Sequence, residues 1–171
     1  GFIDRTGGEV IPPFYNRIGS FGSHGVNWAR VEKEGLYGYI DRAGKEIVPT
    51  VYDRIHSFGS VGVDWAKVEK NGLLGFIDKS GKEVIKPTYG SIDNFGGITR
   101  YWARIERDGI YGFIDKSGKE VIAPKYDRIY SFGNKGPSHL ALVRSQGYYG
   151  FIDKEGNEVT PTIYDKISSF D

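Results

Sequence analysis

The motif glycine–aromatic–isoleucine–aspartate occurs five times along the 171-residue chain, and this repeat constrains the fold more than any other feature. Successive copies are separated by 37, 37, 37 and 38 residues. They begin at Gly1, Gly38, Gly75, Gly112 and Gly150. A period of this length indicates a tandem array of small units, each of which buries its apolar faces only against its neighbours.

Most aromatic residues keep the same step. The in-phase tyrosines are Tyr15, Tyr52, Tyr89, Tyr126 and Tyr164, the phenylalanines are Phe21, Phe58, Phe95, Phe132 and Phe170, and the Trp-Ala pairs begin at Trp28, Trp65 and Trp102, with Leu140 in the fourth place. The one extra residue therefore lies between Phe132 and Leu140, and we expect a surface loop there because loops tolerate insertions. We expect the in-phase aromatics to pack between successive units.

Short runs of aromatic and β-branched residues within each period predict strands. The second period has a Trp-Ala strand at 28–32 and a further strand at 37–41. The turn between such strands contains glycine, as in Asn71-Gly72, a pair that tight hairpins prefer. The next turn runs from Asp41 to Gly44, where aspartate can cap the turn and glycine can supply a positive φ.

Proline marks the expected end of a third strand. In the second period this strand is 46–48, and it should stop at Pro49 because proline has no N–H to donate to a sheet. The same place in the other periods is taken by Pro12, Pro87, Pro124 and Pro161. The segment that follows, 52–58, is either a fourth strand or an ordered connector.

The predicted strands contain consecutive apolar residues, such as Phe76-Ile77, whose side chains must point to opposite faces of a sheet. Both faces are therefore expected to be covered by neighbouring units. The predicted fold class is all-β: a tandem repeat of small antiparallel sheets, stacked as an open spiral or solenoid-like array. The alternative is a closed ring that resembles a β-propeller.

The positions of the Trp-Ala strands divide the chain into units of a single repeat array. A partial unit, 1–27, precedes four complete units at 28–64, 65–101, 102–139 and 140–171. The partial unit lacks its Trp-Ala strand, and the other terminus has no spare strand that would complete it in a ring. This division favours the open array, with an unprotected sheet edge in the first unit.

Composition excludes several classes of function. Lys and Arg total 23 and Asp and Glu total 22, so the net charge of +1 gives no basic surface for nucleic acid or an anionic membrane. No apolar stretch approaches the roughly 18 residues of a membrane-spanning helix. The lack of cysteine excludes disulfides and thiolate metal ligands. The lack of methionine, even at position 1, suggests a processed or partial chain, in which no signal peptide is present.

Residues 111–122 read Tyr-Gly-Phe-Ile-Asp-Lys-Ser-Gly-Lys-Glu-Val-Ile and continue through Pro124 and Tyr126 to Phe132. This pattern resembles the WG-repeat family of bacterial proteins, and the resemblance covers essentially the whole chain. The tryptophan that precedes the glycine in the family is replaced here by Tyr37, Leu74, Tyr111 and Tyr149. The resemblance implies an all-β tandem-repeat module that interacts with other macromolecules, has no catalytic residues, and is extracellular or at the cell surface.

Catalysis needs different groups that converge on one point, whereas this repeat distributes copies of the same group along the chain. His24, His56 and His139 lie in connecting segments, and their spacing matches no metal-binding pattern. The aspartate of each motif copy has at most one serine as a partner oxygen, so we interpret these aspartates as turn caps rather than as calcium ligands. We therefore predict that the protein is not an enzyme and binds neither a metal nor a cofactor.

Two series of basic residues also recur in phase: Arg17, Arg54, Arg128 and Lys166, and Arg30, Lys67 and Arg104. Acidic residues lie beside most of them, which favours solvated faces with paired charges over a stripe that binds an acidic polymer. The many aromatic residues also raise the alternative of glycan binding, because sugars stack on exposed Trp and Tyr.

Residues that depart from the repeat pattern give one array a surface that differs from the surfaces of other arrays. The candidate partner-binding residues are Phe14, Arg100, Tyr101, Tyr130, His139 and Tyr148. We expect a non-enzymatic repeat scaffold that binds a protein partner or copies of itself, without nucleic acid binding or membrane insertion. The alternative is a binding module for glycan or cell-wall polymer.

Overall fold

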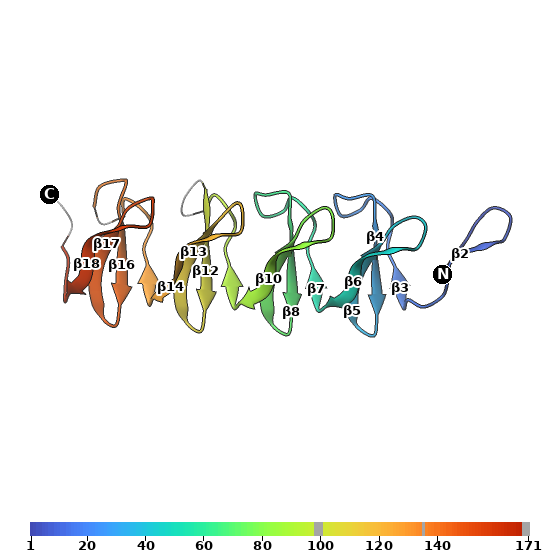
Figure 1. The fold of residues 1–171 in the computed structure, drawn as a ribbon, viewed down its shortest axis with the longest axis horizontal. Helices are drawn as coiled ribbons and strands as arrows, with labels where there is room; N and C mark the ends of the chain where they lie inside the picture. Colours follow the sequence, from blue (N-terminus) through green and yellow to red (C-terminus); the bar gives the residue numbers. More distant parts are fainter. Residues whose placement is uncertain (98–100, 135, 169–171) are drawn as a thin grey trace. The chain divides into compact units, whose positions relative to one another are not determined.

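The computed structural model describes residues 1–97, 101–134 and 136–168, which form eighteen β-strands and no helix (Figure 1). None of the described residues therefore belongs to a helix that could cross a membrane. The chain divides into two compact units, Gly1–Thr88 and Tyr89–Asp171. The predicted all-β fold, built from repeated small sheets, is confirmed.

The first unit contains one sheet of two strands and two sheets of four. The small sheet pairs β1 (Phe2–Ile3) with β2 (Glu9–Ile11). The second sheet has the order β3 (Arg17–Ile18), β4 (Ala29–Lys33), β5 (Leu36–Ile40) and β6 (Glu46–Tyr52), and the third has β7 (Arg54–Ile55), β8 (Ala66–Lys70), β9 (Leu73–Ile77) and β10 (Glu83–Tyr89). The paired strands run antiparallel.

The second unit repeats this arrangement in two further four-stranded sheets. One has the order β11 (Ser91–Ile92), β12 (Trp102–Arg107), β13 (Ile110–Asp115) and β14 (Glu120–Tyr126), and the other has β15 (Arg128–Ile129), β16 (Ala141–Ser145), β17 (Tyr148–Ile152) and β18 (Glu158–Tyr164). Every sheet of the described chain is an open row of strands, and none closes into a barrel.

The segment after four of the five in-phase tyrosines contains a two-residue strand, which favours the fourth-strand alternative that the sequence left open. The segment 165–168, after Tyr164, forms no strand. Arg54–Ile55 pairs with β8, the Trp-Ala strand that follows it in the chain. Arg17–Ile18 pairs with β4 in the same way. Each four-stranded sheet therefore begins with this short strand, before the Trp-Ala strand from which the sequence units are counted.

The hairpin turns have the predicted conformation. Asn71 and Gly72, which join β8 and β9, have φ values of 53° and 75°. Positive φ at both central residues gives a turn whose twist matches that of the flanking strands. The equivalent pairs also have positive φ: Glu34 and Gly35, Asp108 and Gly109, and Gln146 and Gly147.

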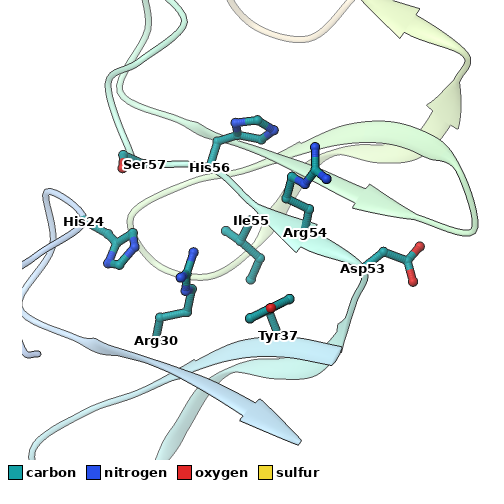
Figure 2. A pocket seen from close by; sticks show the side chains of 8 residues that line it. All are labelled: His24, Arg30, Tyr37, Asp53, Arg54, Ile55, His56 and Ser57. Carbon is teal, nitrogen blue, oxygen red and sulfur yellow. The ribbon is translucent and has the colours of Figure 1, made fainter. Parts of the chain in front are cut away.

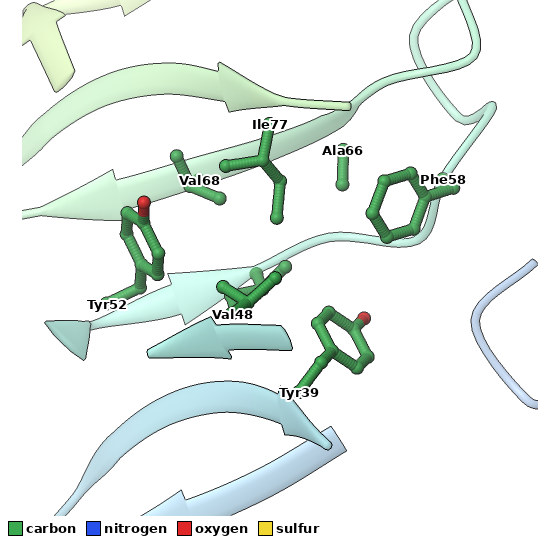
Figure 3. Packing of buried hydrophobic residues seen from close by; sticks show 8 residues of the cluster. Tyr39, Val48, Tyr52, Phe58, Ala66, Val68 and Ile77 are labelled. Carbon is green, nitrogen blue, oxygen red and sulfur yellow. The ribbon is translucent and has the colours of Figure 1, made fainter. Parts of the chain in front are cut away.

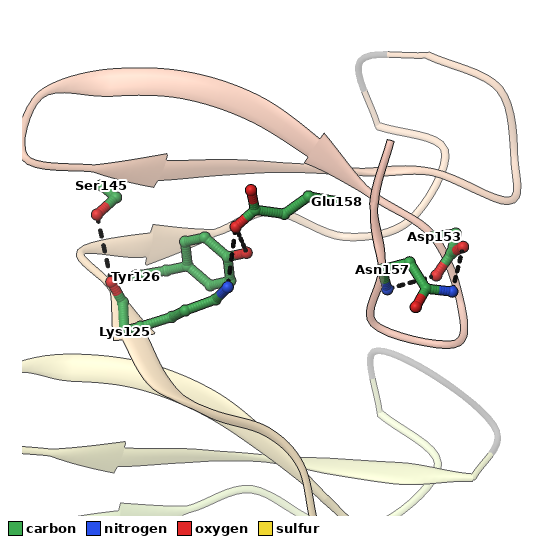
Figure 4. A network of polar contacts seen from close by, with 6 residues as sticks. All are labelled: Lys125, Tyr126, Ser145, Asp153, Asn157 and Glu158. Atoms are coloured by element: carbon green, nitrogen blue, oxygen red, sulfur yellow. Dashed lines mark hydrogen bonds and ion pairs between the residues drawn. The ribbon is translucent and has the colours of Figure 1, made fainter. Parts of the chain in front are cut away.

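The motif aspartates cap the following turns, as the sequence predicts. The Oδ1 atom of Asp78 accepts hydrogen bonds from the backbone N–H of Ser80 (2.8 Å) and from that of Lys82 (3.1 Å). Burial raises the pKa of Asp78, but these bonds and one from the Ser80 hydroxyl outweigh it and leave the pKa below its usual value. Asp153 forms the same type of cap with Asn157 (Figure 4).

The prediction that proline ends the third strand is wrong for four of the five periods. Strand β6 continues through Pro49 to Tyr52, and β10, β14 and β18 contain Pro87, Pro124 and Pro161 in the same way. The register between β5 and β6 passes from Tyr39↔Val48 to Tyr37↔Tyr52, so β6 is bulged at its proline. Because β6 is an edge strand, the missing N–H of Pro49 leaves no neighbouring strand unpaired. Only at Pro12 does the strand, β2, end before the proline.

Successive sheets within each unit pack through the in-phase residues. In the first unit Tyr39, Val48 and Tyr52 of the second sheet form one buried cluster with residues of the third sheet and of the loop between β7 and β8 (Figure 3). The residues contributed to that cluster are Ile55, Phe58, Ala66, Val68 and Ile77. The second unit has an equivalent cluster that contains Phe113, Ile122 and Tyr126. The expectation that in-phase aromatics pack between sheets is confirmed for these residues, whereas Tyr164 is exposed and Phe170 lies outside the described residues.

A tyrosine–glutamate hydrogen bond also recurs at three of the in-phase tyrosines. The hydroxyl of Tyr52 donates to Glu83 Oε1 (2.9 Å), and that of Tyr89 donates to Glu120 Oε1 (2.6 Å). The hydroxyl of Tyr126 donates to Glu158 Oε1 (3.2 Å), which also accepts from Lys125 (Figure 4). The glutamate thus provides a hydrogen-bond acceptor for the tyrosine hydroxyl, which lies at the margin of an otherwise apolar cluster.

Candidate functional site

The last sheet carries a shallow apolar hollow of about 170 Å³, which we call the terminal hollow. Its lining residues are Phe151, Thr160, Tyr164 and Ile167. One period earlier, the equivalent residues are Phe113, Ile122, Tyr126 and Ile129, all buried in the cluster between the two sheets of the second unit. Tyr164 is 45% exposed, whereas Tyr126 is 1% exposed. The terminal hollow thus contains the equivalents of residues that pack against a neighbouring sheet elsewhere in the unit, and Tyr164 is the exposed one among them.

The first sheet carries residues equivalent to those that elsewhere pack against such a surface from the neighbouring sheet. Ile3 on β1 is 71% exposed, although its equivalents Ile40, Ile77, Ile114 and Ile152 are all fully buried. Ile152 lies in the cluster with Phe113, Ile122 and Tyr126. Glu9, on β2, stands one period before Glu46 in the series of glutamates that includes Glu83, Glu120 and Glu158. Ile3 and Glu9 therefore present an uncovered apolar group and a carboxylate on one small sheet.

A second candidate site is an open groove of about 420 Å³ in the first unit, which we call the basic groove (Figure 2). Its lining residues are His24, Arg30, Tyr37, Asp53, Arg54, Ile55, His56 and Ser57. Arg30 and Tyr37 come from β4 and β5 of the second sheet, and 53–57 is the segment that begins the third sheet.

Hydrogen bonds hold both sides of the basic groove in place. The backbone N–H of His56 donates to the carbonyl oxygen of Lys67 (2.9 Å), which fixes the segment 53–57 against β8. The backbone N–H of Phe58 donates to the carbonyl oxygen of His24 (3.1 Å), which joins the loop before β4 to that segment. This bond brings His24 and His56 to one groove, although they lie in different repeats of the chain.

The groove combines two guanidinium groups with one carboxylate. The Cζ atom of Arg30 lies 5.1 Å from the centre of the Tyr37 ring, so the cation packs over an aromatic face. Neither Arg30 nor Arg54 takes part in the ion pairs found among the described residues. Asp53 Oδ2 accepts a hydrogen bond from the backbone N–H of Asn71 (2.5 Å).

Both histidines of the groove have a pKa below the usual value for histidine. Burial lowers the pKa of His24, and the positive charge of Arg30 lowers it further. Partial desolvation lowers the pKa of His56, and Lys67 and Arg54 add to this effect while Glu69 opposes it. The Nδ1 atom of His24 lies 2.8 Å from the Ser23 hydroxyl. Sequence reasoning placed these histidines in unrelated connectors, and the one signal that joins them is their position in loops of neighbouring repeats.

The predicted partner-binding residues lie mostly at the surface. Phe14, between β2 and β3, is 69% exposed, Tyr101, just before β12, is 63% exposed, and His139 is also exposed. Tyr130 is half-buried, with the Cζ atom of Arg128 5.6 Å from its ring centre. Arg100 lies outside the described residues.

The structure does not bring all of these residues to one place. Tyr148 is opposite Ser145 at the turn of the β16–β17 hairpin, whereas His139 precedes Ala141 at the other end of β16. These two residues therefore lie at opposite ends of the sheet. A role for any of the six in binding a partner stays a prediction, and the basic groove contains none of them.

Among the described residues, no group of three or more His, Asp or Glu side chains lies close enough to hold a metal ion. The tryptophans do not form an exposed aromatic platform. Trp28 packs against Tyr39 and Phe58, with ring centres 5.8 and 5.9 Å apart. Trp102 is 8% exposed and packs against Phe113.

Comparison with known proteins identifies the sequence pattern. The family model described as "WG containing repeat" matches residues 1–37, 37–73, 75–98, 111–149 and 149–171. A comparison with curated protein sequences finds no match. Among solved structures, the chain is similar to the crystal structure of Hsv2 from Kluyvelomyces marxianus, with 6% sequence identity and a TM-score of 0.32. That similarity covers 81% of this chain and 46% of the other.

Proposed function

Since this chain belongs to the WG-containing repeat family, we propose that it is a non-enzymatic repeat scaffold whose first partner is a second copy of itself, bound head to tail. The observation that carries the proposal is the terminal hollow. Its four residues are equivalent to four that pack against a neighbouring sheet elsewhere in the chain. A second copy of the chain offers a repeat sheet that can pack against this surface in the same way.

The contact inside the second unit supplies the geometry of the proposed contact between copies. Ile152 packs there among Phe113, Ile122 and Tyr126. In the proposed assembly, Ile3 of a second copy takes the place of Ile152 and fills the terminal hollow. Glu9 of that copy takes the place of Glu158 and accepts a hydrogen bond from the Tyr164 hydroxyl. The contact joins two different surfaces, so each copy keeps one of them free for the next.

Protein interaction accounts for the aromatic residues better than glycan binding does. A glycan platform needs exposed aromatic faces, whereas Trp28 and Trp102 pack against the buried rings of Tyr39 and Phe113. We propose an extracellular or cell-surface location only because of what the family resemblance implies. The family resemblance is also what supports a bacterial origin and the absence of catalysis.

Light scattering across a range of concentrations tests the proposed self-association. We expect the mass of the particles to rise with concentration for the unaltered chain. The substitutions Ile3→Glu and Thr160→Glu should each prevent this, because each places a charge in the apolar contact. Leu73→Glu is the matched control, since Leu73 is 40% exposed in the β8–β9 hairpin and belongs to neither surface.

Mixing the two variants tests the head-to-tail arrangement itself. The Ile3→Glu variant keeps an intact terminal hollow, and the Thr160→Glu variant keeps an intact Ile3. Their mixture should therefore form dimers and nothing longer. A chain that stays monomeric at every concentration, or that loses assembly equally through Leu73→Glu, would contradict the proposal.

A further inference from the structure

We propose that the basic groove binds an acidic segment of a partner protein, whose Asp or Glu carboxylates pair with Arg30 and Arg54. The inference names a partner for the protein-binding role proposed above. It does not depend on the head-to-tail contact, which uses the terminal hollow and Ile3 instead. The two proposals can therefore fail separately.

The first argument is the state of the arginines. Arg30 is half-buried against Tyr37 and forms no ion pair with another described residue. In the second unit its equivalent, Arg104, pairs with Asp93 through Nη2 and Oδ2 at 3.0 Å. A guanidinium that is partly removed from water gains most from a carboxylate partner, and Arg30 has none within the chain described.

The second argument is that residues outside the repeat pattern concentrate in this groove. Where the groove has His24, the next period has Val61, which is buried. His56 is equivalent to Gly19, Asp93 and Tyr130 in the other periods. The segment that begins the fourth sheet thus has a carboxylate at the place where the basic groove has an imidazole. The imidazole of His56 thus replaces the carboxylate that pairs with Arg104, and Arg30 lacks that partner.

The third argument identifies the ligand as a peptide rather than a free anion. Asp53 and the Ser57 hydroxyl lie on the same wall as Arg54. A peptide offers carboxylates to the arginines and backbone N–H groups to the Asp53 carboxylate, whereas phosphate offers the groove almost only acceptors. The net charge of +1 for the whole chain also argues against a long polyanion. An extended segment with spaced acidic residues matches all of these groups.

Fluorescence anisotropy of a labelled Glu-rich peptide with the full chain tests the inference. We expect binding that the same peptide with Gln in place of Glu does not show. The double substitution Arg30→Gln and Arg54→Gln should weaken binding about tenfold or more, because it removes two charge-assisted hydrogen-bonding groups. Arg128→Gln is the matched control, since Arg128 is equivalent to Arg54 but lies in the other unit.

Three outcomes would overturn the inference. The first is equal binding of the Glu and Gln peptides, and the second is an equal loss through Arg128→Gln. The third is displacement of the peptide by inorganic phosphate at an equal concentration, which would assign the groove to a small anion. The Thr160→Glu variant should bind the peptide normally, so loss of self-association and loss of peptide binding remain distinguishable. Circular dichroism of the Gln variants checks that they are folded.

Discussion

The Cα atom of Gly38 lies against the backbone carbonyl of Val48, and a Cβ atom added to Gly38 would lie 2.5 Å from that oxygen. It would also lie 2.8 Å from the carbonyl carbon of Pro49. The bulge of β6 thus rests on the one residue of β5 that has no side chain. The motif glycines Gly75, Gly112 and Gly150 have the same close approach to the bulges of β10, β14 and β18.

We predict that Gly38→Ala lowers the free energy of unfolding by about 1–3 kcal/mol, the usual cost of forcing an extra carbon into a packed site. The contact is with backbone, which cannot move aside as a flexible side chain can. Gly97→Ala is the control, because among the described residues an added Cβ there meets the Asn94 carbonyl oxygen alone, at 3.4 Å. Urea unfolding of both variants measures the difference. Equal stability of the two would mean that the bulge relaxes at no cost.

This contact also shows where reasoning from the sequence stops. The repeat, the hairpin turns and the aspartate caps follow from local rules that Asn71-Gly72 and Asp78 obey. The course of β6 through Pro49 does not, because it depends on an edge position and on a bulge that fits over Gly38. The expectation that proline ends a strand considers that strand alone and takes no account of the strand beside it.

The basic groove could not be predicted from the sequence, for a similar reason. His24 and His56 are brought together by a hydrogen bond between the backbones of two loops, Phe58 N–H to His24 carbonyl, and no residue type encodes that bond. The terminal hollow, by contrast, could be anticipated in part. Tyr164 belongs to the periodic series of tyrosines, which the repeat predicts to pack between successive units.

Tyr39 gives a prediction of increased stability. Its side chain is fully buried, and its hydroxyl has no hydrogen-bond partner among the described residues. The equivalent residues Phe2, Phe76, Phe113 and Phe151 have no hydroxyl at this place. An unpartnered buried hydroxyl costs about 1–3 kcal/mol, so Tyr39→Phe should raise the free energy of unfolding by roughly 1 kcal/mol.

Urea unfolding monitored by tryptophan fluorescence measures the effect of Tyr39→Phe. The control is Tyr126→Phe, which removes a hydroxyl that does donate a hydrogen bond, to Glu158 (3.2 Å). That variant should lose stability while the first gains it. A loss in both would show that the Tyr39 hydroxyl has a partner in solution.

The Tyr89–Glu120 pair predicts a loss of stability in alkali. Burial, and then the hydrogen bond to Glu120, raise the pKa of Tyr89 to about 12. Because the folded pKa lies above the unfolded value of 10.0, the stabilisation is complete below that value and is lost as the pH rises toward 12. Tyr89→Phe should remove this part of the alkaline transition, measured by circular dichroism against pH. Tyr148→Phe, at an exposed tyrosine, should leave it unchanged.

The histidines of the basic groove predict that binding of the acidic peptide strengthens in acid. Both have a lowered pKa, so protonation of the rings is favoured only at acidic pH, and the positive charge of the groove near neutral pH comes from Arg30 and Arg54. The charged groups that face them are Arg30 for His24, and Lys67, Arg54 and Glu69 for His56. A bound carboxylate favours protonation of either ring, so peptide binding takes up protons.

We therefore expect the affinity for the Glu-rich peptide to increase as the pH falls from about 8 to about 5.5, a range in which histidine titrates and glutamate stays ionised. Replacing both groove histidines, His24→Gln with His56→Gln, should flatten this dependence while binding at the upper end of the range persists through the arginines. His139→Gln, at an exposed histidine outside the groove, is the control. A pH dependence that survives the double substitution would place the titrating group elsewhere and remove the histidines from the site.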